Sequence, residues 1–143
     1  MKKTALISGI SGQDGAYLAE LLIRKNYKVI GTDRRSARSN NWRLKRLGIH
    51  NKVISEEMEL GEIYEIDRVF RKYKIDEVYN LAAQSFVASS FHSPLNTSNI
   101  TALGALRVLE EFFAQGDWEK QVHPPLLRQT FETFGFSGGW STP

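Results

Sequence analysis

The sequence predicts an α/β fold in which helices wind around both faces of a parallel sheet. Short apolar runs alternate with stretches of helical periodicity from Thr4 to about residue 111. A turn rich in glycine separates the first apolar run from the first helical stretch. The chain has 143 residues, which is enough for one domain with its own core.

The first strand is predicted over residues 4–8, and a turn with the spacing G-x-x-G-x-x-G follows it at Gly9, Gly12 and Gly15. Gly9 lets the chain leave the strand in a tight turn, and Gly12 removes a Cβ where backbone would approach a pyrophosphate. Gly15 allows the helix to pack closely. Free N–H groups at the helix start attract phosphate, so the pattern is typical of a Rossmann-type dinucleotide-binding domain.

The next elements complete a βαβ unit and extend it. Helical spacing of leucines predicts a helix near residues 15–25, and Asn26 suits the left-handed residue that ends it. Residues 28–32 predict a second buried strand. A short helix over residues 41–47, closed by Gly48, and a weak strand over residues 52–55 follow.

The alternation continues after Gly61, where an apolar stripe predicts a helix that contains Ile66 and Phe70. Residues 77–81 predict a fourth strand, and another helix is expected after Pro94. Right-handed crossovers would join these strands in parallel. The pattern stops at Phe112, so we expect a domain over residues 1–111 and an irregular tail over residues 112–143.

Composition excludes several classes of protein. Apolar content is 41% and no apolar run is long enough for a membrane span, so a globular chain is expected. The chain has no cysteine, and its N-terminus lacks the pattern of a signal peptide, so cytoplasmic residence is the default expectation. The three histidines show no metal-ligand spacing, and neither a P-loop nor a Gly-x-Ser-x-Gly elbow is present.

Positive charge is concentrated in one segment. The formal net charge is +3, and residues 34–46 hold several lysines and arginines but no acid. A solvated loop and short helix explain Arg38, Lys45 and Arg46 as well as a binding role does. The segment offers no aromatic platform beyond Trp42, so nucleic acid is not expected as a partner.

Three features follow predicted strands, where ligands bind in this fold. Asp33 would hold the ribose hydroxyls of NAD, whereas Arg34 and Arg35 would accept the 2′-phosphate of NADP. The arginine pair favours NADP, and NAD is the alternative. Glu59 and Leu60 stand where adenine is expected, with a surface loop as the alternative. The small residues of Asn80-Leu81-Ala82-Ala83-Gln84-Ser85 would admit a cofactor, with tight helix–sheet packing as the alternative.

These motifs together resemble one family. Gly-Gln-Asp-Gly at residues 12–15, Arg-Arg-Ser at residues 34–36 and the segment 80–85 are similar to the GDP-mannose 4,6-dehydratases, which are extended short-chain dehydrogenase/reductases. The likeness covers about residues 3–111. It implies an NADP-dependent lyase that converts GDP-mannose to GDP-4-keto-6-deoxymannose, and a homo-oligomer in the full-length members.

The resemblance also implies site residues. Gly9, Ser11, Gly12, Gln13, Asp14 and Gly15 would form the pyrophosphate turn, and Arg34, Arg35 and Ser36 would meet the 2′-phosphate. Glu59 and Leu60 would lie beside adenine, and the nicotinamide side would be lined by Leu81, Ala82, Ala83, Gln84 and Ser85.

The sequence departs from the family at several points. Asp33 replaces a neutral residue, Glu59 replaces aspartate, and Asn96 stands where several members have tyrosine. The Tyr-x-x-x-Lys pair that serves as general base and the Ser-Thr-Ser-Glu segment are missing. No catalytic residue is therefore assigned, and the chain alone is expected to be inactive.

The loss of pattern near residue 112 suggests a truncated or frame-shifted product, with a short natural variant as the alternative. Two further functions stay open. One is another NAD(P)-dependent nucleotide-sugar epimerase or reductase, and the other is a non-catalytic nucleotide-binding module.

Overall fold

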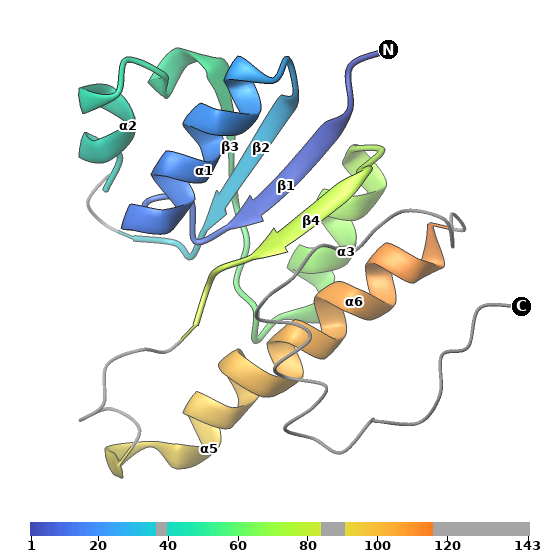
Figure 1. The fold of residues 1–143 in the computed structure, drawn as a ribbon. Coiled ribbons are helices and arrows are strands. Elements are labelled where there is room, and N and C mark those ends of the chain that lie inside the picture. Colours follow the sequence, from blue (N-terminus) through green and yellow to red (C-terminus); the bar gives the residue numbers. More distant parts are fainter. Residues whose placement is uncertain (37–39, 84–90, 116–143) are drawn as a thin grey trace, which may run out of the picture.

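The computed structural model describes residues 1–36, 40–83 and 91–115. A parallel sheet with strand order β3-β2-β1-β4 lies at its centre, with helices packed on both faces (Figure 1). The predicted α/β fold with a parallel sheet is therefore confirmed. The elements in chain order are β1 (Thr4–Ser8), α1 (Gln13–Arg24), β2 (Lys28–Asp33), α2 (Trp42–Arg46), η1 (His50–Lys52), β3 (Val53–Glu57), α3 (Ile63–Lys72), β4 (Glu77–Asn80), α5 (Pro94–Ser98), η2 (Asn99–Leu103) and α6 (Gly104–Ala114).

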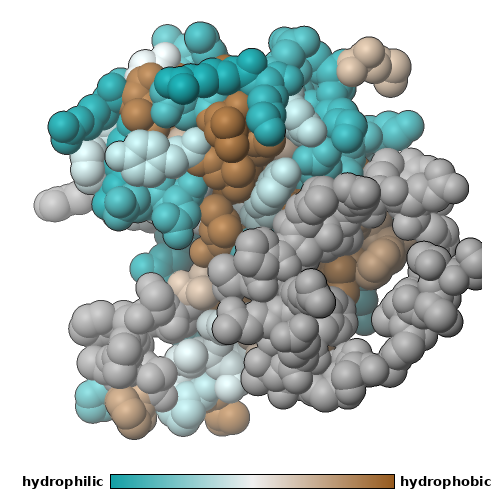
Figure 2. Space-filling view, viewed as in Figure 1, coloured by the Kyte–Doolittle hydropathy of each residue, from teal (hydrophilic) through white to brown (hydrophobic). Residues whose placement is uncertain are grey.

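The central strand β1 is buried on both sides because both faces of the sheet are covered. Ala5 and Ile7 of β1 lie in the cluster under α1 and α2, whereas Leu6 between them lies in the cluster under α3 and α6. Side chains alternate across a strand, so a strand buried on both faces reads as a continuous apolar run. The outer surface over α1 and α2 is mainly hydrophilic, with a hydrophobic strip beside it (Figure 2).

The strand order sets where a ligand can enter. The chain moves outward from β1 to β2 and β3, then returns so that β4 pairs with β1 on its other side. Such a reversal of strand order opens a crevice outside the carboxyl ends of β1 and β4.

Element ends agree with the sequence within a few residues. Asn26 has a φ of 66°, so the predicted left-handed residue after α1 is confirmed, and Gly48 after α2 has a φ of 68°. The strand predicted over 28–32 extends to Asp33, and the one predicted over 52–55 runs from Val53 to Glu57.

The last helix continues beyond the expected loss of pattern. α6 ends at Ala114, and Phe112 is 3% exposed in the cluster formed with α3. The domain boundary at residue 111 stays a prediction, since residues 116–143 lie outside the described part. No helix among the described residues is long and apolar enough to cross a bilayer.

Glycine at position 31 makes room for the turn after β1. A Cβ on Gly31 would lie 2.5 Å from Cγ1 and 2.9 Å from Cβ of Ile10, which is 2% exposed. Ile10 therefore lies directly on the β2 backbone and anchors the turn to the sheet.

Glu56 of β3 holds a network with α3. Its carboxylate accepts hydrogen bonds from Lys72 Nζ at 2.6 Å, Tyr73 OH at 2.5 Å and Arg68 Nη1 at 3.0 Å. Burial alone would raise the pKa of Glu56, but these donors outweigh it and lower the pKa to about 2.

A second carboxylate lies at the start of β4, on the amino-terminal side of the sheet. Glu77 accepts hydrogen bonds from Lys3 Nζ at 3.1 Å, Tyr27 OH at 2.9 Å and Tyr79 OH at 2.8 Å. Burial would raise the pKa of Glu77, but these three donors lower it. β1, β2 and β4 are therefore tied together at the end opposite the crevice.

We expect Glu56→Gln to lower the free energy of unfolding at neutral pH. In acid, this difference from the wild type should disappear. The wild-type contribution is complete above the unfolded pKa of about 4.3 and disappears as pH falls through about 2. Urea unfolding at pH 7 and at pH 3 to 4 measures the difference in free energy of unfolding between the two proteins, which should be smaller at the lower pH. Asp67→Asn is the control, because Asp67 forms an ion pair with Arg71, whose side chain is 80% exposed. A gap that stays constant with pH would contradict the assignment.

Gly15→Ala tests the packing of α1 on the turn. A Cβ there would lie 2.4 Å from Gly9 O and 2.9 Å from Ile10 Cα. These are backbone atoms, which cannot relieve the clash by changing rotamer as a side chain can. We expect a loss of about 1–3 kcal/mol in the free energy of unfolding. Gly61→Ala, whose Cβ would be 3.4 Å from Asn99 Nδ2, should change it by less than about 0.5 kcal/mol. Equal effects of both substitutions on urea midpoints would refute the packing role.

Candidate functional site

The turn between β1 and α1 forms one side of the crevice. Gly9 has a φ of +76°, and a Cβ on it would lie 3.0 Å from Ala82 N and 3.1 Å from the carbonyl carbon of Leu81. The turn therefore contacts the segment after β4 through bare backbone. Only glycine combines this φ with this approach, as the sequence predicted for Gly9.

The start of α1 presents its amides beside the turn. Gly12 is the N-cap, and no side chain caps the helix there. Gln13 and Asp14 form the first turn of the helix with Gly15, where an added Cβ would lie 2.4 Å from Gly9 O. Uncapped N–H groups at a helix start attract anions, as the sequence analysis expected.

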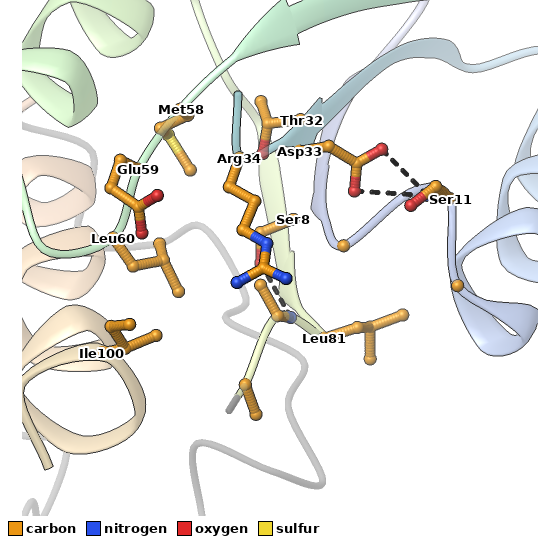
Figure 3. Close-up of a pocket in the computed structure, with 14 residues that line it drawn as sticks. Ser8, Ser11, Thr32, Asp33, Arg34, Met58, Glu59, Leu60, Leu81 and Ile100 are labelled. Atoms are coloured by element: carbon orange, nitrogen blue, oxygen red, sulfur yellow. Dashed lines mark hydrogen bonds between the residues drawn. The ribbon is translucent and has the colours of Figure 1, made fainter. Parts of the chain in front are cut away.

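A cleft of about 350 Å³ opens where these elements meet (Figure 3). It collects many of the residues predicted for the cofactor: Gly9, Ser11, Gly12, Arg34, Glu59, Leu60, Leu81, Ala82 and Ala83. Gln13, Asp14, Gly15 and Arg35 do not line it. Ser85, also predicted, and Gln84 lie outside the described residues.

Sequence reasoning missed Ser8, Thr32, Met58 and Ile100 as lining residues. Ser8 and Thr32 lie within strands that were read as core, and only the position of each near a strand end could have singled them out. Thr32 is 1% exposed, and its Oγ1 has no hydrogen-bond partner among the described residues. A buried hydroxyl beside the cleft is thus available to a bound molecule.

Asp33 bonds to the turn. The N–H of Ser11 donates to both carboxylate oxygens of Asp33, at 3.2 and 3.4 Å. Burial raises the pKa of Asp33, while the hydrogen bonds from Ser11 oppose that shift. The carbonyl of Ser11 accepts a hydrogen bond from Arg43 Nη1 at 2.9 Å. The N–H of Ser11 is therefore bound by β2 and its carbonyl by α2.

Arg34 points the other way. Its side chain extends from the end of β2 into the cleft, between Leu60 and Leu81, while Asp33 turns toward Ser11 (Figure 3). Arg34 has no hydrogen-bond or ion-pair partner in the part of the chain that the structure describes. A guanidinium in this state can take a bidentate anion without breaking an existing pair.

A second hollow of about 610 Å³ adjoins the first and shares Ser11, Asp33 and Arg34 with it. Ser36, Asn40 and Asn41 line it on one side, and the acidic end of β3 lies on another. Arg34 is thus accompanied by neutral polar side chains from the loop after β2. Arg35, which was predicted for the same role, lines neither hollow.

Buried polar groups order the floor between β1 and β4. The Ser8 hydroxyl donates to Asn80 Oδ1, and the N–H of Ala82 donates to Ser8 Oγ at 3.4 Å. The N–H of Leu81 donates to Ser8 O at 3.1 Å. The segment of small residues after β4 is therefore fixed against β1. The described residues hold no cluster of histidine and carboxylate side chains that could bind a metal.

Comparisons with known proteins agree with this arrangement. The family model for GDP-mannose 4,6 dehydratase matches residues 6–123. The GDP-mannose 4,6-dehydratase of Vibrio cholerae serotype O1 is 45% identical over 114 residues, which cover 76% of this chain and 31% of that protein. GDP-mannose 4,6 dehydratase 1 of Arabidopsis thaliana is 43% identical over 115 residues, covering 76% and 32%. The chain thus spans about a third of the length of the curated relatives it matches.

Solved structures with the same fold include nucleotide-sugar epimerases. The UDP-glucose 4-epimerase of Thermotoga maritima, solved with UDP-glucose, has a TM-score of 0.67 and 25% identity, covering 79% of this chain and 35% of that one. The epimerase Mth375 of Methanothermobacter thermautotrophicus has a TM-score of 0.68 and 25% identity, covering 80% and 33%. With the family model matching most of its length, this chain belongs to the GDP-mannose 4,6-dehydratase family.

Proposed function

We propose that this chain is the cofactor-binding part of a GDP-mannose 4,6-dehydratase and that its cofactor is NADP. The observation that carries the proposal is the cleft at the carboxyl ends of β1 and β4, which joins the glycine turn to Arg34 and Leu60. Its position is the one at which doubly wound folds bind dinucleotides. The identities of 41–45% to several dehydratases, against 25% to the epimerases, support this substrate class over the epimerase alternative.

The residues present fit a dinucleotide. Gly9 and Gly12 leave backbone bare beside the cleft, and the amides at the start of α1 favour the pyrophosphate. Leu60 and Ile100 offer an apolar wall for the adenine ring. Leu81, Ala82 and Ala83 leave space for the nicotinamide side, and the unpartnered Thr32 hydroxyl can bond to the bound molecule.

The choice of NADP over NAD rests on two neighbouring side chains. Arg34 has no partner among the described residues, and Ser36, Asn40 and Asn41 lie around the adjoining hollow as further donors. Asp33 favours NAD by its chemistry, but its carboxylate is already engaged by the Ser11 N–H. A free guanidinium selects an added phosphate, so NADP is the preferred cofactor.

The bound cofactor would supply a hydride acceptor for C4 of the sugar and return that hydride at C6. Proton transfer in this chemistry needs a tyrosine with a lysine four residues later. The five tyrosines of the chain are Tyr17, Tyr27, Tyr64, Tyr73 and Tyr79, and none has such a lysine. We therefore propose that the chain binds cofactor but does not turn over GDP-mannose by itself.

A nucleic-acid role for the basic segment has less support. Arg43 lies 4.4 Å from the centre of the Trp42 ring and donates to Ser11 O, so Arg43 is used within the fold. A mobility-shift experiment with DNA provides the counter-test. Binding of DNA without binding of NADPH would favour the non-catalytic module.

Titration with NADPH and NADH, followed by nucleotide fluorescence, tests the cofactor. We expect NADPH to bind more tightly, and Arg34→Gln to weaken NADPH by at least about tenfold while changing NADH little. Arg46→Gln is the matched control, because it removes the same charge from a residue that is exposed on α2. Equal losses in both variants, or no binding of either nucleotide by the wild type, would overturn the proposal.

Asp33→Asn tests how the acid limits the preference for NADP. The asparagine oxygen can still accept from the Ser11 N–H, but the negative charge beside a 2′-phosphate is gone. We expect the ratio of the NADH to the NADPH dissociation constant to rise by about tenfold. Glu62→Gln, an equal charge change at the exposed start of α3, should leave the ratio unchanged. A fall in the ratio would mean that Asp33 does not oppose the phosphate.

A further inference from the structure

Arg107 of α6 joins two segments that wall the cleft, although it does not line the cleft itself. Its Nη1 donates to Leu60 O at 3.0 Å and to Asn99 O at 3.2 Å, and its Nη2 donates to Asn99 Oδ1 at 2.7 Å. Leu60 belongs to the loop after β3, and Asn99 begins η2. One guanidinium therefore fixes the distance between them.

η2 is a turn of π-helix. The N–H of Gly104 donates back to Asn99 O, which is the wide hydrogen-bond spacing of that helix type. Arg107 adds a second donor to the same carbonyl. The wide turn carries Ile100, which lines the cleft and also packs against the core cluster of α3 and α6. Isolated π turns inside α-helices occur frequently at functional sites.

Leu60 is held closely on the other side of the same contact. A Cβ on Gly104 would lie 2.8 Å from Leu60 Cβ and 3.2 Å from Leu60 O, so the start of α6 packs directly on it. Leu60 is 3% exposed and has little room to shift. Figure 3 shows Leu60 and Ile100 next to each other, across the cleft from Leu81.

The three acceptors of Arg107 are neutral oxygens, and no carboxylate pairs with it among the described residues. Its role is therefore geometric: a planar fork with several donors spans two carbonyls and an amide, which the single ammonium of lysine cannot do. Hydrogen bonds from a charged donor are stronger than neutral ones, so this link resists opening.

We propose that Arg107 is a positioning residue for the adenine ring of the cofactor. By tying Leu60 to the π turn, it keeps Leu60 and Ile100 at the spacing that forms a flat apolar wall. The inference rests on the proposed function, because it needs a dinucleotide in the cleft. Without Arg107, the loop after β3 and the π turn separate. The adenine ring is then no longer held in one position, although the pyrophosphate turn is intact.

The test uses etheno-NADP, whose modified adenine is fluorescent, with the full chain and the variants Arg107→Met and Arg107→Lys. The readout is the fluorescence anisotropy of the etheno-adenine at saturation, which reports how firmly the ring is held and does not depend on the folded fraction. We expect Arg107→Met to lower this anisotropy and raise the dissociation constant about tenfold. For Arg107→Lys we expect an anisotropy and a dissociation constant between those of Arg107→Met and the wild type.

Arg71→Met is the control, because it removes the same charge from the exposed face of α3, where Arg71 pairs with Asp67. It should leave the anisotropy unchanged. A folded Arg107→Met protein with wild-type anisotropy and affinity would overturn the proposal.

Should Arg107→Met fail to fold, Asn99→Ala removes one of the three acceptors of Arg107, Asn99 Oδ1, and keeps the two backbone carbonyls. It is expected to weaken binding about threefold and lower the anisotropy. Wild-type values for both Asn99→Ala and Arg107→Lys would likewise refute the role of Arg107. A wild-type chain that does not bind etheno-NADP would refute the proposed function together with this inference, whereas normal wild-type binding with unchanged variants refutes the inference alone.

Discussion

The backbone of the turn after β1 is held by hydrogen bonds to the end of β2 and to α2. Thr32 O accepts from the N–H groups of Gly9 and Ile10, at 2.8 and 3.3 Å. Asp33 and Arg43 bind the N–H and the carbonyl of Ser11. Because β1 is paired on both sides, the turn is fixed relative to β2 and β4 alike. Two walls of the cleft, the end of β2 and the segment after β4, are therefore positioned relative to this turn.

The fold could be predicted from the sequence because its signals are local. The glycine spacing, the apolar runs and the left-handed Asn26 each act within a few residues of their own position. The lining by Leu60 and Leu81 could also be predicted, because strand ends in a parallel sheet meet at one edge. These parts of the site follow from chain order and periodicity alone.

The remaining features depend on contacts between distant segments. Nothing local indicates that Asp33 turns toward Ser11 while Arg34 turns away, or that Arg35 lines neither hollow. The π turn at Asn99 interrupts a pattern that reads as ordinary helix, and Arg107 reads as a surface arginine. Ile100 packs against the core cluster of α3 and α6, and it also reaches the cleft because that wide turn carries it there.

Ile10 and Gly31 have a consequence for related sequences. The side chain of Ile10 occupies the space that a side chain on Gly31 would need. Position 31 can therefore enlarge during divergence only if position 10 shrinks at about the same time. The two positions should co-vary in an alignment of relatives, and this pair would record how closely the phosphate turn sits on the sheet in each lineage.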